Sequence, residues 1–215
     1  MNNEQSVSLA ENVYRQLRSA IVDGEYRPNE RLIEADIARR LDASRTPVRE
    51  SLQRLHNEGL VDLRHRSWTV REHDAEEIMQ IYDIRTPLEG YAARLAAQRA
   101  SDDQIAAIVA LNAQLTFELA MSDRSTFIQL HDEFHRAVYA AAANPRLSKI
   151  IHEHRHHRFN RRIVHLFTPD QLRVNIAGHA AIVEALRDHD GERIELITRE
   201  HLEAAKVVAL QLAAY

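Results

Sequence analysis

Two histidines one helical turn apart, His131 and His135, stand in the segment QLHDEFHR with Asp132 and Glu133 between them. Residues four apart share one face of a helix. The pattern fits a metal-binding helix, an acid–base pair, or a helix that happens to carry histidines. Because each residue turns the helix by about 100°, the two carboxylates point away from the face that the histidines share. The pair is therefore better suited to metal binding than to acid–base chemistry.

A second pair, His179 and His201, can complete such a site. The two residues lie about 11 positions before and after the turn signal Asp190-Gly191, so two antiparallel helices joined at that turn would bring them to one level. Imidazole suits zinc, nickel, copper or iron. The chain has no cysteine, so a metal would need His, Asp or Glu ligands. Each histidine taken singly is as readily a solvated or hydrogen-bonded side chain.

A further group of histidines lies in the segment IIHEHRHHRFNRRIVHL. Its members are His152, His154, His156 and His157. No histidine elsewhere has a spacing that would complete a site with them. We interpret this segment mainly as a cationic helix, either solvated or at the rim of a pocket. Its arginines Arg158, Arg161 and Arg162 could contribute to an anion site.

Residues 74–215, which carry all these candidates, show helical periodicity almost throughout and no strand pattern. Capping and turn signals such as Asn144-Pro145 and Thr168-Pro169 divide the segment. The expected helices are 74–99, 102–120, 124–142, 146–166, 170–188 and 192–213. Because the joints between them are short, they predict an all-α antiparallel bundle.

Residues 1–73 predict shorter elements. Apolar residues four apart indicate one helix from Leu9 to Val22 and a second around 33–41. Thr46 is a suitable N-cap for a third helix, with Pro47 at its first position and Gly59 as its stop.

Two short apolar runs, 60–63 and 68–70, then flank a hairpin tip. Three helices and a hairpin form a winged helix-turn-helix. We therefore expect a mainly α protein, with this DNA-binding domain at 1–73 and an all-helical domain at 74–215.

The third helix carries Arg45, Arg49 and Gln53 four residues apart, opposite its apolar stripe. In a recognition helix the N-terminal residues reach base edges in the major groove. Arg can clamp guanine and Gln can pair with adenine. The plainer interpretation is a solvated arginine face.

Contacts to the DNA backbone have their own candidates. Ser44 and Thr46 can donate to phosphates near the helix N-terminus, where the helix dipole favours an anion. His65 and Arg66 at the hairpin tip could reach the minor groove or the backbone. Bulk charge does not point to DNA, since the net charge is −4, so this prediction depends on where the arginines lie.

The segment RLIEADIARRLDASRTPVRESLQRLHNEGLV resembles the DNA-binding domain of GntR-family transcription regulators, over residues 9–71. The resemblance implies operator contacts from Arg45 and Arg49, assisted by the other residues named above. Three residues depart from the usual pattern, because Asn29, Asp42 and Ser67 stand where glycine is common. Asn and Asp tolerate a left-handed backbone, so the first two changes are mild.

Three later segments, IYDIRTPLEGYAARLAA, FHRAVYAAAANPRL and HAAIVEALRDHD with REHL, resemble the FCD domain of the FadR subfamily over residues 77–205. The resemblance implies a metal site in which one helix supplies Asp and His at four-residue spacing and two later helices supply one His each. His135, His179 and His201 match, whereas His131 stands at the aspartate position and Asp132 is displaced by one residue.

We expect either a four-histidine site or a three-histidine site with His131 uncommitted. A neutral imidazole shell favours a divalent transition metal over magnesium or calcium, with zinc as the first choice and nickel or another such metal as alternatives.

Arg85 lies on an otherwise apolar helix side. It can pair with Glu89 one turn on, or, as the resemblance implies, clamp the carboxylate of a small organic acid effector. Asn175, one turn before His179, could hydrogen-bond the same ligand.

These features together predict a homodimeric transcription regulator and not an enzyme. We expect a repressor that binds a palindromic operator in double-stranded DNA and releases it when the effector binds. No apolar run approaches the roughly 20 residues of a membrane span and the N-terminus lacks the apolar core of a signal peptide, so we expect a cytoplasmic protein. A metalloenzyme is the alternative, with Glu133 the nearest general base but on another helix face. A third interpretation is a metal-only sensor, in which binding of the metal itself is the signal.

Overall fold

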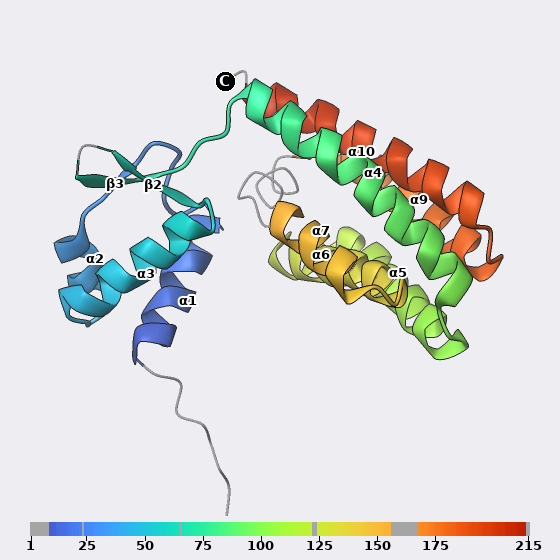
Figure 1. Ribbon diagram of the computed structural model, residues 1–215, viewed down its shortest axis with the longest axis horizontal. Coiled ribbons are helices and arrows are strands. Elements are labelled where there is room, and N and C mark those ends of the chain that lie inside the picture. The colour runs from blue at the N-terminus through green and yellow to red at the C-terminus, as the bar shows by residue number, and fades with distance from the viewer. Residues whose placement is uncertain (1–8, 23, 65, 122–123, 156–166, 214–215) are drawn as a thin grey trace, which may run out of the picture. The chain divides into compact units, whose positions relative to one another are not determined.

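A computed structural model describes residues 9–22, 24–64, 66–121, 124–155 and 167–213 (Figure 1). The chain divides into two compact units, Met1–Glu72 and His73–Tyr215. The first unit combines helices with a small sheet, and the described part of the second is helical. The mainly α fold class predicted from the sequence is therefore confirmed.

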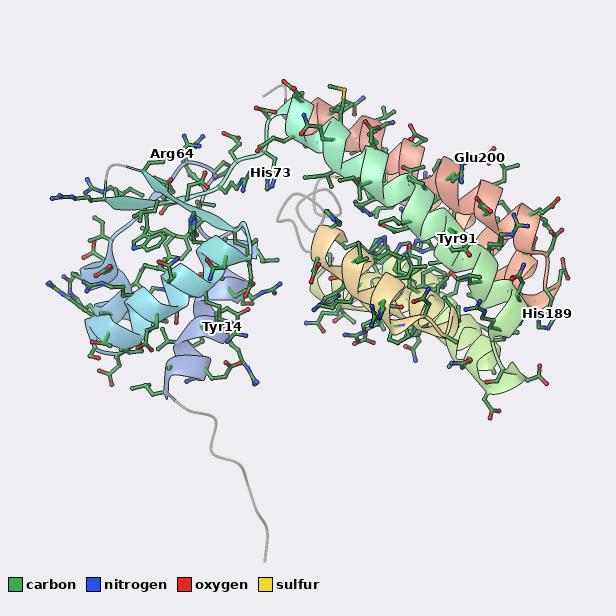
Figure 2. The ribbon with its side chains drawn as sticks, viewed as in Figure 1. Tyr14, Arg64, His73, Tyr91, His189 and Glu200 are labelled. Carbon is green, nitrogen blue, oxygen red and sulfur yellow. The ribbon has the colours of Figure 1, made fainter. Side chains whose placement is uncertain are left out.

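The first unit is a winged helix-turn-helix. Its elements are α1 (Leu9–Val22), β1 (Arg31–Leu32), α2 (Glu34–Arg40), α3 (Arg45–Asn57), β2 (Val61–Arg64) and β3 (Ser67–Val70). The strands form an antiparallel sheet in the order β1-β3-β2. The apolar faces of the helices and the sheet share one core, in which Leu17, Leu52 and Val70 are almost completely buried. Tyr14 of α1 joins α1 to the end of α3, because its hydroxyl donates to Glu58 (Figure 2).

The predicted start of α3 was wrong by two residues. The N-cap is Ser44, with φ −78° and ψ 166°, so the helix begins at Arg45 and Thr46 lies inside it. Pro47 becomes the third helical residue instead of the first. It is tolerated there because the N–H groups of the first turn have no acceptor within the helix. The end of α3 agrees with the sequence, since Gly59 follows it with φ +71°.

Strand β1 was not predicted, because two residues are too short to show a periodicity. Arg31 pairs with Thr69 and Leu32 with Trp68. Backbone φ is positive at Asn29 and Asp42, two of the positions where glycine was expected.

In the wing the positive φ falls on Arg66, at 64°. Ser67 is the first residue of β3. The glycine-like position of the hairpin is therefore one residue earlier than expected.

The second unit is a bundle of antiparallel helices. The described helices are α4 (Ala75–Arg99), α5 (Asp102–Met121), α6 (Arg124–Ala141), α7 (Pro145–Arg155), α9 (Pro169–Arg187) and α10 (Gly191–Ala213). Where both ends are described, the predicted bounds agree within one residue. Residues 156–166, the second half of the predicted helix 146–166, lie outside the described residues. Among the described helices, none is both long and apolar enough to cross a membrane.

Helices α4 and α10 lie side by side along most of their lengths, and α9 is antiparallel to α10 (Figure 1). The turn between α9 and α10 is tied to α4, because Nδ1 of His189 lies 2.8 Å from the carbonyl oxygen of Ala97 (Figure 2). The N-terminus of α10 is capped by Asp190, which accepts from the backbone N–H of Arg193 at 3.0 Å. This turn sets the register between α9 and α10, on which the site described next depends.

Candidate metal centre

Four buried histidines from three helices meet inside the second unit. His131 and His135 come from α6, His179 from α9 and His201 from α10, and each is at most 9% exposed. Their potential ligand atoms all lie within 4.8 Å of one another. Among the described residues, this is the one group of three or more potential ligands that could hold a metal ion. The structure thus brings together the two histidine pairs that the sequence singled out.

The α9–α10 register and a glycine place His201 against α9. The ring centroids of His179 and His201 are 4.8 Å apart, as equal distances from the turn require. A Cβ atom on Gly178 would lie only 2.7 Å from Nδ1 of His201. The imidazole can therefore occupy its position only because residue 178 has no side chain.

The four side chains fit a transition metal. Nε2 of His135 lies 3.2 Å from Nε2 of His179, and two nitrogens on a tetrahedral zinc, each about 2.0–2.1 Å from the ion, would be about 3.3 Å apart. Within the described part of the chain, Nε2 of His131 and Nδ1 of His179 are buried without a hydrogen-bond partner. Each buried nitrogen without a partner destabilises the fold by about 1–3 kcal/mol. A metal ion bound to one of them would offset that cost.

Burial keeps these imidazoles neutral, the form that binds metals. Burial lowers the pKa of His131 to about 3, despite the opposing charge of Asp132. Burial, followed by the nearby positive charge of Arg155, lowers the pKa of His201 to about 4. The same two causes hold the pKa of His135 well below its usual value. For His179, burial and then His201 lower the pKa.

A buried ionic network adjoins the histidines. Glu89 of α4 is fully buried and pairs with Arg85 at 2.6 Å and with Arg155 of α7 at 2.7 Å. Tyr139 of α6 donates its hydroxyl to the same carboxylate, and its oxygen lies 3.3 Å from Nδ1 of His135. Although burial opposes ionisation, the two arginines hold the pKa of Glu89 at about 2.

A small cavity is lined by residues of both the network and the histidine group. Its volume is about 30 Å³, room for about two water molecules. Arg85, Arg155, Asn175, His131 and His201 are among its lining residues.

A larger hollow of about 450 Å³ lies between α9 and α10. It shares Phe167, Asn175, His201 and Ala205 with the small cavity, so the two spaces adjoin. Their combined volume suits a small organic molecule.

The predicted DNA contacts lie on the surface of the first unit. The predicted contacts on or next to α3 are all exposed, namely Ser44, Arg45, Thr46, Arg49 and Gln53. Arg49 bridges to Glu34 of α2 through Nε at 3.0 Å and Nη2 at 2.8 Å. Ser44 makes no side-chain capping bond to the helix. At the wing Arg66 is exposed, as is Arg64 (Figure 2), whereas His65 lies outside the described residues.

The two units match two known families in the expected order. Residues 9–70 match the family described as bacterial regulatory proteins, gntR family, and residues 80–204 match the FCD domain. The chain belongs to the GntR family.

Among curated GntR relatives, the Nta operon transcriptional regulator of Aminobacter aminovorans is 34% identical over 133 residues, which cover 60% of this chain and 62% of that protein. The HTH-type regulator YdhC of Bacillus subtilis is 29% identical over 143 residues, 64% of this chain and 62% of that protein. The chain thus spans less than two thirds of the length of either relative.

The solved structure of Escherichia coli McbR/YncC has a TM-score of 0.81 and 26% identity, covering 96% of this chain and 99% of that one. The two curated relatives are named as transcriptional regulators, and the family matched by residues 9–70 is one of bacterial regulatory proteins.

This GntR-family chain departs from the expected ligand pattern at one position. His131, at the aspartate position, is a full member of the buried group, whereas Asp132 is half-buried and lines the cavity without joining that group. Glu133, the nearest general base for a metalloenzyme, is exposed. In the described part of the second histidine cluster, His152 is exposed and His154 half-buried, and neither belongs to the buried group.

Three residues of the site were not predicted from the sequence. Tyr139 follows His135 by four residues, so helix spacing alone could have placed it on the ligand face. Gly178 is a glycine inside a helix, a signal for close approach. Arg155 had no such signal, because its contact with Glu89 depends on how α7 packs on α4.

Proposed function

We propose that this chain is a homodimeric, ligand-responsive DNA-binding transcription regulator. It acts as a repressor, and its FCD domain binds a divalent transition metal together with a small organic acid. The observation that carries the metal part is the group of four buried, neutral imidazoles. The GntR and FCD family matches support the regulatory part.

The base contacts come from the exposed face of α3. Arg45 and Arg49 lie in its N-terminal half and Gln53 one turn further on, and all three are exposed, as base-reading residues of a recognition helix must be. Ser44, Thr46 and the wing residue Arg66 would contact phosphates. Two copies of the domain would bind the half-sites of a palindrome, since a twofold dimer presents two equal recognition helices.

His131, His135, His179 and His201 would hold the metal. Four neutral nitrogen ligands favour a borderline ion, zinc first and nickel or another divalent transition metal second. When bound, the ion supplies a positively charged anchor for an anionic ligand.

The effector would occupy the cavity beside the histidines. Arg85 is paired with Glu89, so the ion pair considered from the sequence exists, yet Arg85 also lines the cavity. Its guanidinium can contact a carboxylate while it keeps Glu89. Among the described residues, Oδ1 of Asn175 has no hydrogen-bond partner, so it can accept a hydrogen bond from a ligand.

Regulation requires that the acid bind more tightly to the dimer in one arrangement of its two DNA-binding domains than in another. We expect operator affinity to fall as the acid fills the cavity, which would release the operator and relieve repression.

Metal binding is tested by elemental analysis of the full chain after zinc loading and dialysis. The wild type should retain zinc, and the double variant His179→Ala, His201→Ala should lose it. The double variant His152→Ala, His154→Ala is the matched control, because it removes two histidines outside the buried group. Zinc retained by the first variant and lost by the second would overturn the assignment.

Regulation is tested by fluorescence anisotropy on a duplex selected by the protein from random DNA. Small carboxylates should weaken binding to this duplex in the zinc-loaded protein. Zinc alone releasing the duplex would instead indicate a metal-only sensor. If the selected duplex binds no more tightly than a scrambled one, the regulatory assignment is wrong.

A further inference from the structure

We infer that Tyr139 is a positioning residue of the metal centre. Its hydroxyl, held by Glu89, fixes His135 in the tautomer that carries its proton on Nδ1 and leaves Nε2 unprotonated toward the other histidines. The inference rests on the metal binding proposed above, but it concerns a property that the metal-free protein already has.

The Tyr139 hydroxyl has one hydrogen to donate, and it donates that hydrogen to Glu89. The Glu89 carboxylate is fully buried between Arg85 and Arg155, at 2.6 and 2.7 Å. Two guanidinium groups at that distance keep it ionised, and an ionised carboxylate can only accept hydrogen bonds. The bond between Tyr139 and Glu89 therefore has the tyrosine as its donor.

The contact between Tyr139 and His135 must then have the imidazole as its donor. The Tyr139 oxygen lies 3.3 Å from Nδ1 of His135, a long hydrogen bond in which the oxygen has only lone pairs left. A neutral imidazole carries one N–H, and His135 is only 3% exposed, an environment that disfavours the charged form. Its proton is consequently on Nδ1, and the lone pair of Nε2 points at Nε2 of His179, 3.2 Å away.

His135 differs in this respect from two of its neighbours. Nε2 of His131 and Nδ1 of His179 have no partner among the described residues, so no outside group fixes their protons in the same way. A ligating histidine usually donates its second N–H to a carboxylate or carbonyl, and loss of that partner weakens metal binding about 10–100-fold. Here a tyrosine hydroxyl stands between the imidazole and the carboxylate.

The arrangement also connects the two parts of the site. Glu89 pairs with the two arginines that line the small cavity and, through Tyr139, orients the proposed metal ligand His135. A ligand that draws Arg85 or Arg155 away from Glu89 would therefore change the group that orients His135.

The test is Tyr139→Phe, which keeps the aromatic ring and removes only the hydroxyl. Glu89 retains both arginines, so we expect the variant to fold as the wild type does by circular dichroism. Zinc affinity, measured by competition with a chelating dye, should fall about 10–100-fold. In the metal-free protein, imidazole ¹⁵N NMR should show His135 as the Nδ1–H tautomer in the wild type and a loss of that preference in the variant.

Tyr82→Phe is the matched control. Tyr82 is also a buried tyrosine and lies under Arg85, but it belongs to α4 and not to the ligand helix. We expect its removal to leave the His135 tautomer and the zinc affinity unchanged.

An unchanged tautomer in Tyr139→Phe would overturn the inference, and so would an unchanged zinc affinity in a protein whose wild type binds zinc. Failure of the wild type to bind zinc would instead contradict the proposed function. Because the tautomer is read without metal, the two failures are distinguishable.

Discussion

Replacing Gly178 with alanine should separate metal binding from fold stability. The new Cβ would lie 2.7 Å from Nδ1 of His201, whereas ordinary contacts begin at 3.4 Å. The imidazole must therefore move by about 0.7 Å, the difference between the two distances. Zinc–nitrogen bonds are about 2.0–2.1 Å long and tolerate deviations of about 0.2 Å, so His201 cannot remain a normal ligand. We expect zinc affinity to fall at least about tenfold, about 1.4 kcal/mol.

The fold should respond differently. Alanine is favoured over glycine inside a helix by about 0.5–1 kcal/mol, which offsets part of the cost of displacing the imidazole. We therefore expect the free energy of unfolding of the metal-free protein to change by less than the free energy of zinc binding. Urea unfolding with a chelator measures the first quantity, and dye competition at pH 7.5 measures the second.

Gly90→Ala is the control for this experiment. It makes the same change in α4, where the new Cβ would lie 3.0 Å from Cγ of Arg199, an exposed and flexible side chain. Zinc affinity should be unchanged in this variant. Wild-type zinc affinity in Gly178→Ala would refute the reasoning, since His201 would then not be a ligand in the position described.

Three other predictions concern pH, the operator and the effector. The folded-state pKa values of His131 and His201 are about 3 and about 4, below the unfolded value of 6.5, so the unfolded state binds more protons as the pH falls. The free energy of unfolding of the metal-free protein should therefore be highest above pH 6.5. Below that pH it should decrease by about 1 kcal/mol per histidine per pH unit. Urea unfolding at pH 7.0 and 5.5 measures this, and equal stabilities would contradict it. Arg49→Ala should reduce the preference for the operator over scrambled DNA by about 1–3 kcal/mol without changing the circular dichroism spectrum, since its bond to Glu34 is on the surface; an unchanged preference in anisotropy titrations would exclude Arg49 from base reading. Arg85→Lys keeps a positive charge beside Glu89 but loses the planar guanidinium that can clamp a carboxylate. Added carboxylates should therefore raise the melting temperature of this variant less than that of the wild type, while its zinc content stays the same. A shift as large as in the wild type would exclude Arg85 from the effector site.

Helix geometry explains why much of this site could be predicted from the sequence. The spacing of His131 and His135 fixes their common face, and the turn near Gly191 fixes the level of His179 and His201. Both deductions depend only on helical repeat and antiparallel pairing. They required no knowledge of which side chains fill the space between helices.

The residues that escaped prediction depend on packing between elements. Arg155 reaches Glu89 across 66 positions of the sequence, and no periodic pattern encodes how α7 packs on α4. The start of α3 was ambiguous for a local reason. Ser44 and Thr46 are both good N-caps, and Pro47 is acceptable at either the first or the third helical position.

The cavity beside the four histidines also has a charge balance. Arg85 and Arg155 bring two positive charges, which Glu89 and the half-buried Asp132 cancel. Neutral imidazoles add nothing, so a divalent ion would introduce two charges that no other described residue of the cavity neutralises. Uncompensated charge is costly away from water, and an anion is the remaining means of balance. If the proposed metal and acid both bind there, each raises the other's affinity by the same factor, and the acid would be sensed at lower concentrations in a cell that also supplies the metal.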